Sequence, residues 1–132
     1  DAMQYKHYID RGILYKDYLV AWLEIKRRNI VFTTAQYLNI SMHKIKAGIE
    51  CSMITDKPFF LVVESMKDND IKIANIEHDA LKKYNIYWGG YKNPRPNAPN
   101  DREFMVNIPI ENFNSFQYSE LSDLRRRYEQ SR

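Results

Sequence analysis

Residues 8–29 read YIDRGILYKDYLVAWLEIKRRN, and this stretch decides how the rest of the chain is interpreted. Residues 8–15 and 19–27 are rich in aromatic and branched apolar side chains, which favour β-strands. The polar residues 16–18 between them are typical of a tight reversal. The stretch therefore predicts a β-hairpin.

Two charged side chains in the second strand are the first functional signal. The strand alternates with a period of two, so Glu24 and Lys26 share one face with Trp22. Burying an unpaired carboxylate or ammonium group is costly, and such groups lie inside a sheet only when they are paired or bound to a metal. The two residues are therefore either a structural ion pair at a strand end or part of a metal site.

The position of Asp10 depends on the length of the turn. A turn formed by residues 16–18 places Asp10 directly across the ladder from Glu24, close enough for both carboxylates to share a cation. A shorter or longer turn moves Asp10 to the other face, unless Gly12 supplies a bulge. The shared site is thus compatible with the sequence but not required by it. A structural pair of Glu24 with Lys26 leaves Asp10 unexplained.

Composition limits the class of protein. A chain of 132 residues with 44% hydrophobic and 14% aromatic residues is expected to fold as one domain. The net charge of +3 permits a polyanionic partner without demanding one. A single cysteine, Cys51, excludes an internal disulfide and a multi-cysteine zinc site. With no membrane-length apolar stretch and no signal peptide, we expect a soluble protein in a reducing compartment, without a membrane partner.

The remaining elements indicate a mixed α/β (α+β) fold with a central mixed β-sheet flanked by helices. A stripe of Met42, Ile45, Ile49 and Met53 predicts a helix that Ser41 caps. The other expected elements are a strand at 58–66 buried on both faces, a hairpin partner at 71–76, a helical turn within 77–83, a loop at 84–101, a strand at 103–113 and a helix at 119–130. The segment 30–39 is either a short helical turn or a loop that ends in an extended piece.

Asp10, followed after a turn by Glu24-Ile25-Lys26 on the neighbouring strand, resembles the PD-(D/E)XK nuclease superfamily. The order of later elements is similar to that of small phage-encoded members. The resemblance implies a restriction-endonuclease-like core. It also implies that 1–132 is one nuclease-like domain, with its core at about 5–113 and a C-terminal helical extension at 114–132.

The resemblance also implies a mechanism. Asp10, Glu24 and the backbone carbonyl of Ile25 would hold Mg²⁺ or Mn²⁺, which prefer oxygen ligands. Lys26 would assist the attacking water, and Lys44, early in the predicted helix, would contact a phosphate. The expected activity is hydrolysis of DNA, with RNA a less favoured substrate, in the cytoplasm of the host. Such a core can act as a homodimer or with a partner chain.

Several basic residues are candidates for contacts to the nucleic-acid backbone: Arg27, Arg28, Lys46, Lys92 and Arg95. Each can equally be a solvated surface charge, and the aromatic rings around Lys92 and Arg95 can equally pin the 84–101 loop to the core. A catalytically silent module that binds nucleic acid or protein on the same fold is the alternative function. The short polar start of the chain, where the superfamily usually carries a helix, favours that alternative.

Overall fold

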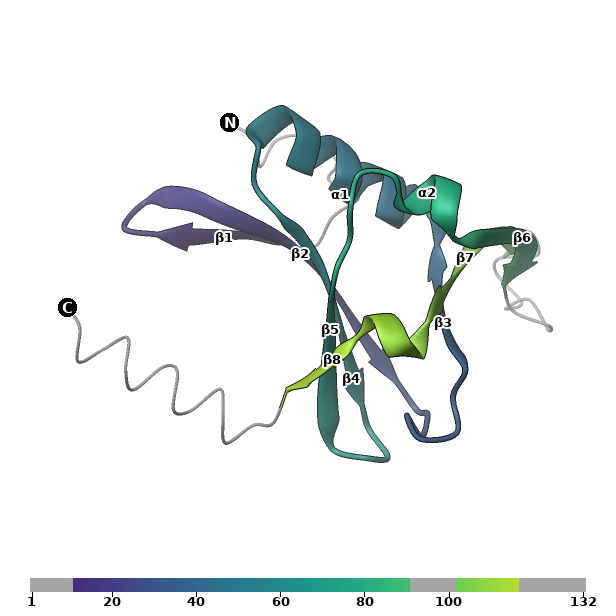
Figure 1. Cartoon of the computed structure of the whole chain (residues 1–132). Coiled ribbons are helices and arrows are strands. Elements are labelled where there is room, and N and C mark those ends of the chain that lie inside the picture. The colour runs from purple at the N-terminus through teal and green to yellow at the C-terminus, as the bar shows by residue number, and fades with distance from the viewer. Residues whose placement is uncertain (1–10, 91–101, 117–132) are drawn as a thin grey trace, which may run out of the picture.

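The computed structural model describes residues 11–90 and 102–116 of the chain (Figure 1). Within these ranges the chain forms β1 (Arg11–Tyr15), β2 (Tyr18–Arg28), β3 (Tyr37–Ser41), α1 (Met42–Thr55), β4 (Phe59–Ser65), β5 (Asp70–Asn75), α2 (Ala80–Lys83), β6 (Asn85–Gly90), β7 (Arg102–Pro109), a 3₁₀ turn (Ile110–Asn112) and β8 (Asn114–Phe116).

The strands form two sheets. The larger is mixed and has the order β1-β2-β4-β5-β8, in which only β2 and β4 run parallel. The smaller is antiparallel, with the order β3-β7-β6. Helix α1 lies along one side of the larger sheet, between β3 and β4 in sequence (Figure 1). The predicted mixed α+β class is confirmed, and the second sheet is an addition to it.

The β1–β2 hairpin has the strand register expected for a three-residue turn, but it is produced by a two-residue turn and a bulge. Its turn contains only residues 16–17, both with positive φ, as a type I′ turn requires. The register then shifts by one at Val20, which forms a bulge in β2, and Arg11 pairs with Leu23. The bulge is therefore in the second strand and not at Gly12. Asp10 itself lies outside the described residues.

Helix α1 begins where the sequence predicts, but its buried stripe is rotated. Gly48 and Ser52 are buried on the same face as Ile45 and Ile49, whereas Met53 is exposed. The prediction that Met53 faces the core is wrong, because the buried face of α1 continues through Gly48 to Ser52, and Met53 lies on the adjacent, exposed side of the helix. The Ser41 hydroxyl also makes no capping hydrogen bond to the helix backbone.

Three other predictions need correction. The segment 85–90, expected to be loop because of Gly89 and Gly90, is strand β6, since Ile86 and Trp88 pair with the apolar residues of β7. Strand β4 is fully buried on one face only. Residues 114–116 of the expected helical extension are strand β8, paired with β5. The predicted helix at 119–130 and the loop 91–101 lie outside the described residues.

The core forms where α1 packs against both sheets. Apolar side chains from α1, β3, β4 and β7 meet there and exclude water. Gly48 of α1 rests against the ring of Phe59 in β4, which is completely buried. A Cβ atom on residue 48 would lie 2.2 Å from two atoms of that ring. Only glycine therefore allows this approach of helix to sheet.

The Gly48→Ala substitution is expected to lower the free energy of unfolding by about 1–3 kcal/mol, the usual cost of overpacking a core. Helix propensity alone would favour alanine, so a loss of stability isolates the steric effect. The measurement is urea unfolding, with Glu50→Ala on the exposed side of the same helix as the control. Equal stability of the two variants would contradict the close packing.

Candidate active site

Glu24 is the only charged residue among the buried ones of the described chain, and its side chain is 0% exposed. It lies in the middle of β2, directly beside Leu61 of β4. Strand alternation turns it, with Trp22 and Lys26, toward the face that α1 covers. A carboxylate at such a position requires compensating charge or hydrogen bonds.

Two lysines supply that compensation. Lys26 Nζ lies 3.3 Å from Glu24 Oε1, and Lys44 Nζ lies 3.9 Å from the same oxygen. Their side chains are 27% and 26% exposed, so both lysines are only partly buried. Lys26 comes from the same strand, whereas Lys44 comes from the first turn of α1. The three side chains together carry a net charge of one positive unit, which suits an anionic ligand.

The two distances exceed the roughly 2.7–2.9 Å of a strong charge-assisted hydrogen bond. The lysines therefore balance the charge of Glu24 at ion-pair distances. Within residues 11–90 and 102–116, however, no three His, Cys, Asp or Glu side chains come together as a metal-binding group.

The backbone of β2 directs Ile25 toward the edge shared with β1. Trp22 N donates to Pro58 O, and Arg28 O accepts a hydrogen bond from Met66 N. The N–H and C=O groups of even-numbered residues in β2 therefore point toward β4 and the residues that flank it. Those of odd-numbered residues point toward β1. The carbonyl of Ile25 consequently points toward the β1 side of β2.

The start of α1 carries a cluster of polar side chains that the sequence does not predict. His43 Nδ1 lies 2.6 Å from Ser41 Oγ and 3.1 Å from Glu103 Oε2. No sequence pattern indicates this cluster, because Glu103 is distant from His43 in sequence and is brought near only by the pairing of β3 with β7. The cluster ties the turn that carries Lys44 to the second sheet.

The other predicted contacts are dispersed. Arg27 lies on the opposite face of the larger sheet and pairs with Glu64 at 3.3 Å. Arg28 Nη2 donates to Asn39 O, which links β2 to β3. Lys46 lies 3.8 Å from Glu50 on the exposed side of α1. The structure thus brings Glu24, Lys26 and Lys44 together, while Asp10, Lys92 and Arg95 lie outside the described residues.

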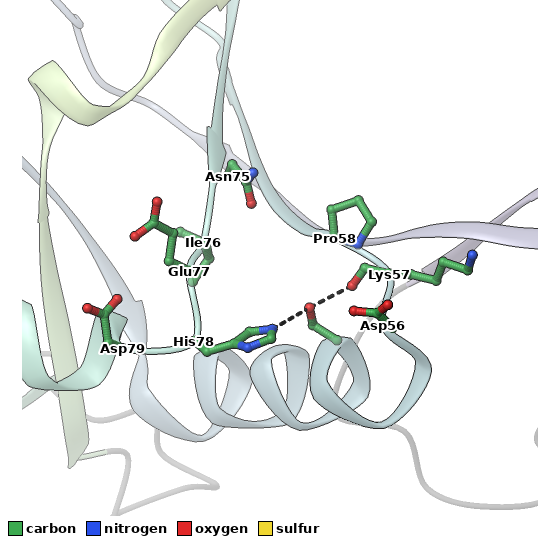
Figure 2. Close-up of a pocket in the computed structure, with 9 residues that line it drawn as sticks. Asp56, Lys57, Pro58, Asn75, Ile76, Glu77, His78 and Asp79 are labelled. Carbon is green, nitrogen blue, oxygen red and sulfur yellow. Dashed lines mark hydrogen bonds between the residues drawn. The ribbon is translucent and has the colours of Figure 1, made fainter.

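A hollow of about 510 Å³ lies at the other end of α1 and contains Ser52 and His78 (Figure 2). Ser52 Oγ donates to Lys57 O at 2.6 Å and lies 3.0 Å from His78 Nε2. Because the carbonyl takes the only hydroxyl proton, His78 must donate to Ser52 and cannot act as its base. The pair is therefore a structural tie between α1 and the loop before α2.

Cys51 offers no alternative chemistry. Burial raises the pKa of its thiol, and the neighbouring charge of Glu50 raises this pKa further. A thiol with a raised pKa stays protonated at neutral pH and is a poor nucleophile. Among the described residues, neither helix combines the length and apolar character needed to cross a membrane.

A buried Glu24 with Lys26 on the same strand, beside a parallel β4 and with a lysine from the connecting helix, matches the pattern of the PD-(D/E)XK type. The chain belongs to the family described as "Phage putative PDDEXK endonuclease", whose model matches residues 1–116. Membership supports a nuclease, and therefore a nucleic-acid substrate, at this coarse level. No curated protein and no solved structure matches the chain.

Proposed function

We propose that the protein is a Mg²⁺- or Mn²⁺-dependent endonuclease that hydrolyses phosphodiester bonds of DNA. The observation that supports this most strongly is the approach of both Lys26 and Lys44 to one oxygen of buried Glu24. A structural ion pair would need one lysine, and buried ion pairs add little net stability. A second cation at this position would be useful for binding an anionic phosphate.

Asp10, Glu24 and the carbonyl of Ile25 are the proposed metal ligands. The described ladder pairs Arg11 with Leu23, so the next pair in a continuous ladder would be Asp10 with Glu24. That register would bring the Asp10 carboxylate next to Glu24 as a second acidic ligand. Carboxylate and carbonyl oxygens suit Mg²⁺ and Mn²⁺, which keep several bound waters in addition.

When bound, the metal would lower the pKa of a coordinated water and neutralise charge on the scissile phosphate. Lys26, next to Glu24, would hold the attacking water and assist removal of its proton. Lys44, at the first turn of α1, would contact a non-bridging phosphate oxygen and stabilise the negative charge that builds up there. Glu24 would hold both ammonium groups in position.

Basic side chains outside the proposed metal site would bind the rest of the DNA. Arg28 already bridges β2 and β3 near the site, and Lys92 and Arg95 precede β7 in the sequence. Arg27 and Lys46 would contribute at most to the longer-range positive field, since each lies next to a carboxylate. We expect the enzyme to act on DNA in the cytoplasm of an infected cell.

The decisive experiment is cleavage of plasmid and single-stranded DNA with Mg²⁺, with Mn²⁺ and with a chelator, using RNA as the comparison substrate. Cleavage of DNA only when a metal is present is expected. The Asp10→Asn variant should require a higher metal concentration for the same rate, because one ligand has lost its charge. A folded protein that cleaves nothing in either metal would instead favour the silent binding module.

A further inference from the structure

Two aromatic side chains form an exposed pair on the smaller sheet. Trp88 of β6 and Phe104 of β7 are cross-strand partners, and their ring centres lie 5.1 Å apart. Trp88 is 53% exposed and Phe104 is 50% exposed. Rings of this size are more stable when they are covered than when they are left in water. The pair is therefore a candidate contact surface for a ligand.

The pair lies at the end of the molecule where β3 leads into α1 (Figure 1). Phe104 is on the same face of β7 as Val106, which is completely buried, so the rings continue the core face beyond the edge of the core. In the neighbouring strand Ser41 pairs with Met105, and α1 begins at the next residue. The first turn of α1 carries Lys44 of the candidate active site. The rings and this lysine thus flank the same helical turn.

The geometry of the pair suits the stacking of a flat group. The two ring planes meet at 75° in an edge-to-face arrangement. In such an arrangement the edge of one ring covers part of one face of the other, and the remaining faces stay open. A planar ligand can therefore stack on one ring while its edge meets the second. Every nucleobase has a planar π-face that stacks on aromatic side chains in this way.

The charges beside the rings favour an anionic ligand. Arg102 lies two residues before Phe104 on the same face of β7, and its Nη2 atom is 3.5 Å from the backbone oxygen of Trp88. Arg102 is exposed, so its guanidinium group can also contact a phosphate. Glu103, by contrast, projects from the opposite face and lies 3.1 Å from His43. The face that carries the rings therefore presents a cation.

The area of the pair is too small for a protein partner. A fully buried aromatic side chain covers about 150–250 Å², so the half-exposed pair offers roughly 200 Å². A stable protein–protein interface covers about 800 Å² on each partner. None of the other exposed large apolar side chains of the described residues lies on β6 or β7. The pair therefore fits one planar group better than it fits a protein surface.

Only some forms of DNA can offer a base to these rings. Inside a duplex the neighbouring base pairs cover both faces of each base, and freeing a base requires unstacking and unpairing. A base in a single strand can stack on an aromatic ring without that cost. We propose that Trp88 and Phe104 bind an unpaired base of a single-stranded DNA substrate, whose backbone then passes the first turn of α1 toward Lys44. This inference rests on the proposed function and names the form of DNA that the site takes.

The test compares the binding of one oligonucleotide as a single strand and as a duplex with its complement, with a chelator present to prevent metal-dependent cleavage. Affinity is measured by the fluorescence anisotropy of the labelled oligonucleotide. The affinity for the single strand should fall by roughly 5- to 150-fold in Trp88→Leu, which is the usual effect of losing one stacked ring. Phe104→Leu should also weaken this binding, and neither variant should change binding of the duplex.

Tryptophan fluorescence gives a second readout of the same contact. The chain has two tryptophans, Trp22 and Trp88. Single-stranded DNA is expected to quench the fluorescence of the wild-type protein, because a stacked base lies directly against one of these rings. Most of that quenching should disappear in Trp88→Leu. The remaining signal comes from Trp22, which lies in the larger sheet.

Two further variants are controls. Trp88→Phe keeps an aromatic face and should retain most of the affinity for the single strand, which separates stacking from loss of structure. Tyr37→Leu is the matched control, because Tyr37 is 52% exposed in the same sheet but pairs with Pro109 at the opposite end. It should bind as the wild type does. Circular dichroism checks that every variant remains folded.

Three results would overturn the stacking site: wild-type affinity in Trp88→Leu, equal losses of affinity for the single strand and the duplex, or quenching that does not involve Trp88. Failure of the proposed function has a different signature. A protein that binds single strands through Trp88 but cleaves no DNA with Mg²⁺ or Mn²⁺ would retain the stacking site and lose the nuclease. A protein that cleaves DNA while Trp88→Leu binds normally would retain the nuclease and lose the stacking site.

Discussion

The Glu24→Gln variant is expected to lose metal-dependent cleavage by more than about 100-fold at a fixed Mg²⁺ concentration. Replacement of residues that only support a metal ligand typically costs 10–100-fold in affinity or activity, and loss of a direct ligand's charge should cost more. Glutamine preserves the shape of the side chain in its fully buried position. It removes the charge that balances Lys26 and Lys44, so their mutual repulsion should further disfavour a cation.

Two measurements separate this effect from unfolding. Calorimetric titration with Mn²⁺ should show much weaker binding to Glu24→Gln than to the wild-type protein. Removing one partner of a buried ion pair typically costs about 3–5 kcal/mol, and the loss of stability here should be smaller because both lysine side chains are partly exposed. Glu50→Gln, an exposed carboxylate on α1, is the control. Wild-type metal affinity in the Glu24 variant would remove this residue from the proposed ligand set.

The Lys26→Met variant is expected to lower the rate constant for cleavage by roughly 10²–10⁴, the usual contribution of a positioned proton-transfer group. Methionine can occupy the space of the lysine stem, which is largely covered, so the fold should persist. The metal should bind at least as tightly as in the wild type, because a positive charge 3.3 Å from Glu24 Oε1 has been removed.

This combination of slower chemistry and undiminished metal affinity distinguishes a role in the reaction from a structural ion pair. Single-turnover cleavage rates and Mn²⁺ titrations of the same samples provide the two readouts. Lys46→Met is the control: it removes a lysine of the same helix that lies 3.8 Å from Glu50, and it should behave as wild type. Unchanged cleavage by Lys26→Met would reject the assignment.

The hairpin and the face of Glu24 and Lys26 could be predicted from the sequence because strand alternation is a local property. The details of the hairpin could not. A two-residue turn with positive φ at Lys16 and Asp17 lacks the glycine or asparagine that usually signals it. The bulge at Val20 offsets the shorter turn, so Arg11 pairs with Leu23 in the register that a three-residue turn would also give.

The second sheet was missed because its strands are supported by partners distant in sequence. Gly89 and Gly90 suggested a loop, yet β6 pairs along its whole length with β7, and the Tyr87 ring covers Gly89. Long-range packing overrides weak local preference in such strands. For the same reason the contact of His43 with Glu103 had no sequence signal, while Lys44 was expected only through the family resemblance.

The pairing of β3 with β7 has a consequence for the order in which the chain acquires its structure. Helix α1 continues directly from β3, and Ser41 at this junction pairs with Met105. During synthesis, Glu24, Lys26 and Lys44 emerge long before β7 is available to fix the start of α1. Contacts between such distant segments slow folding and delay completion of the native state. The nascent protein therefore carries its proposed catalytic lysines well before they can be held together, which would keep it inactive until nearly all of the domain has been made.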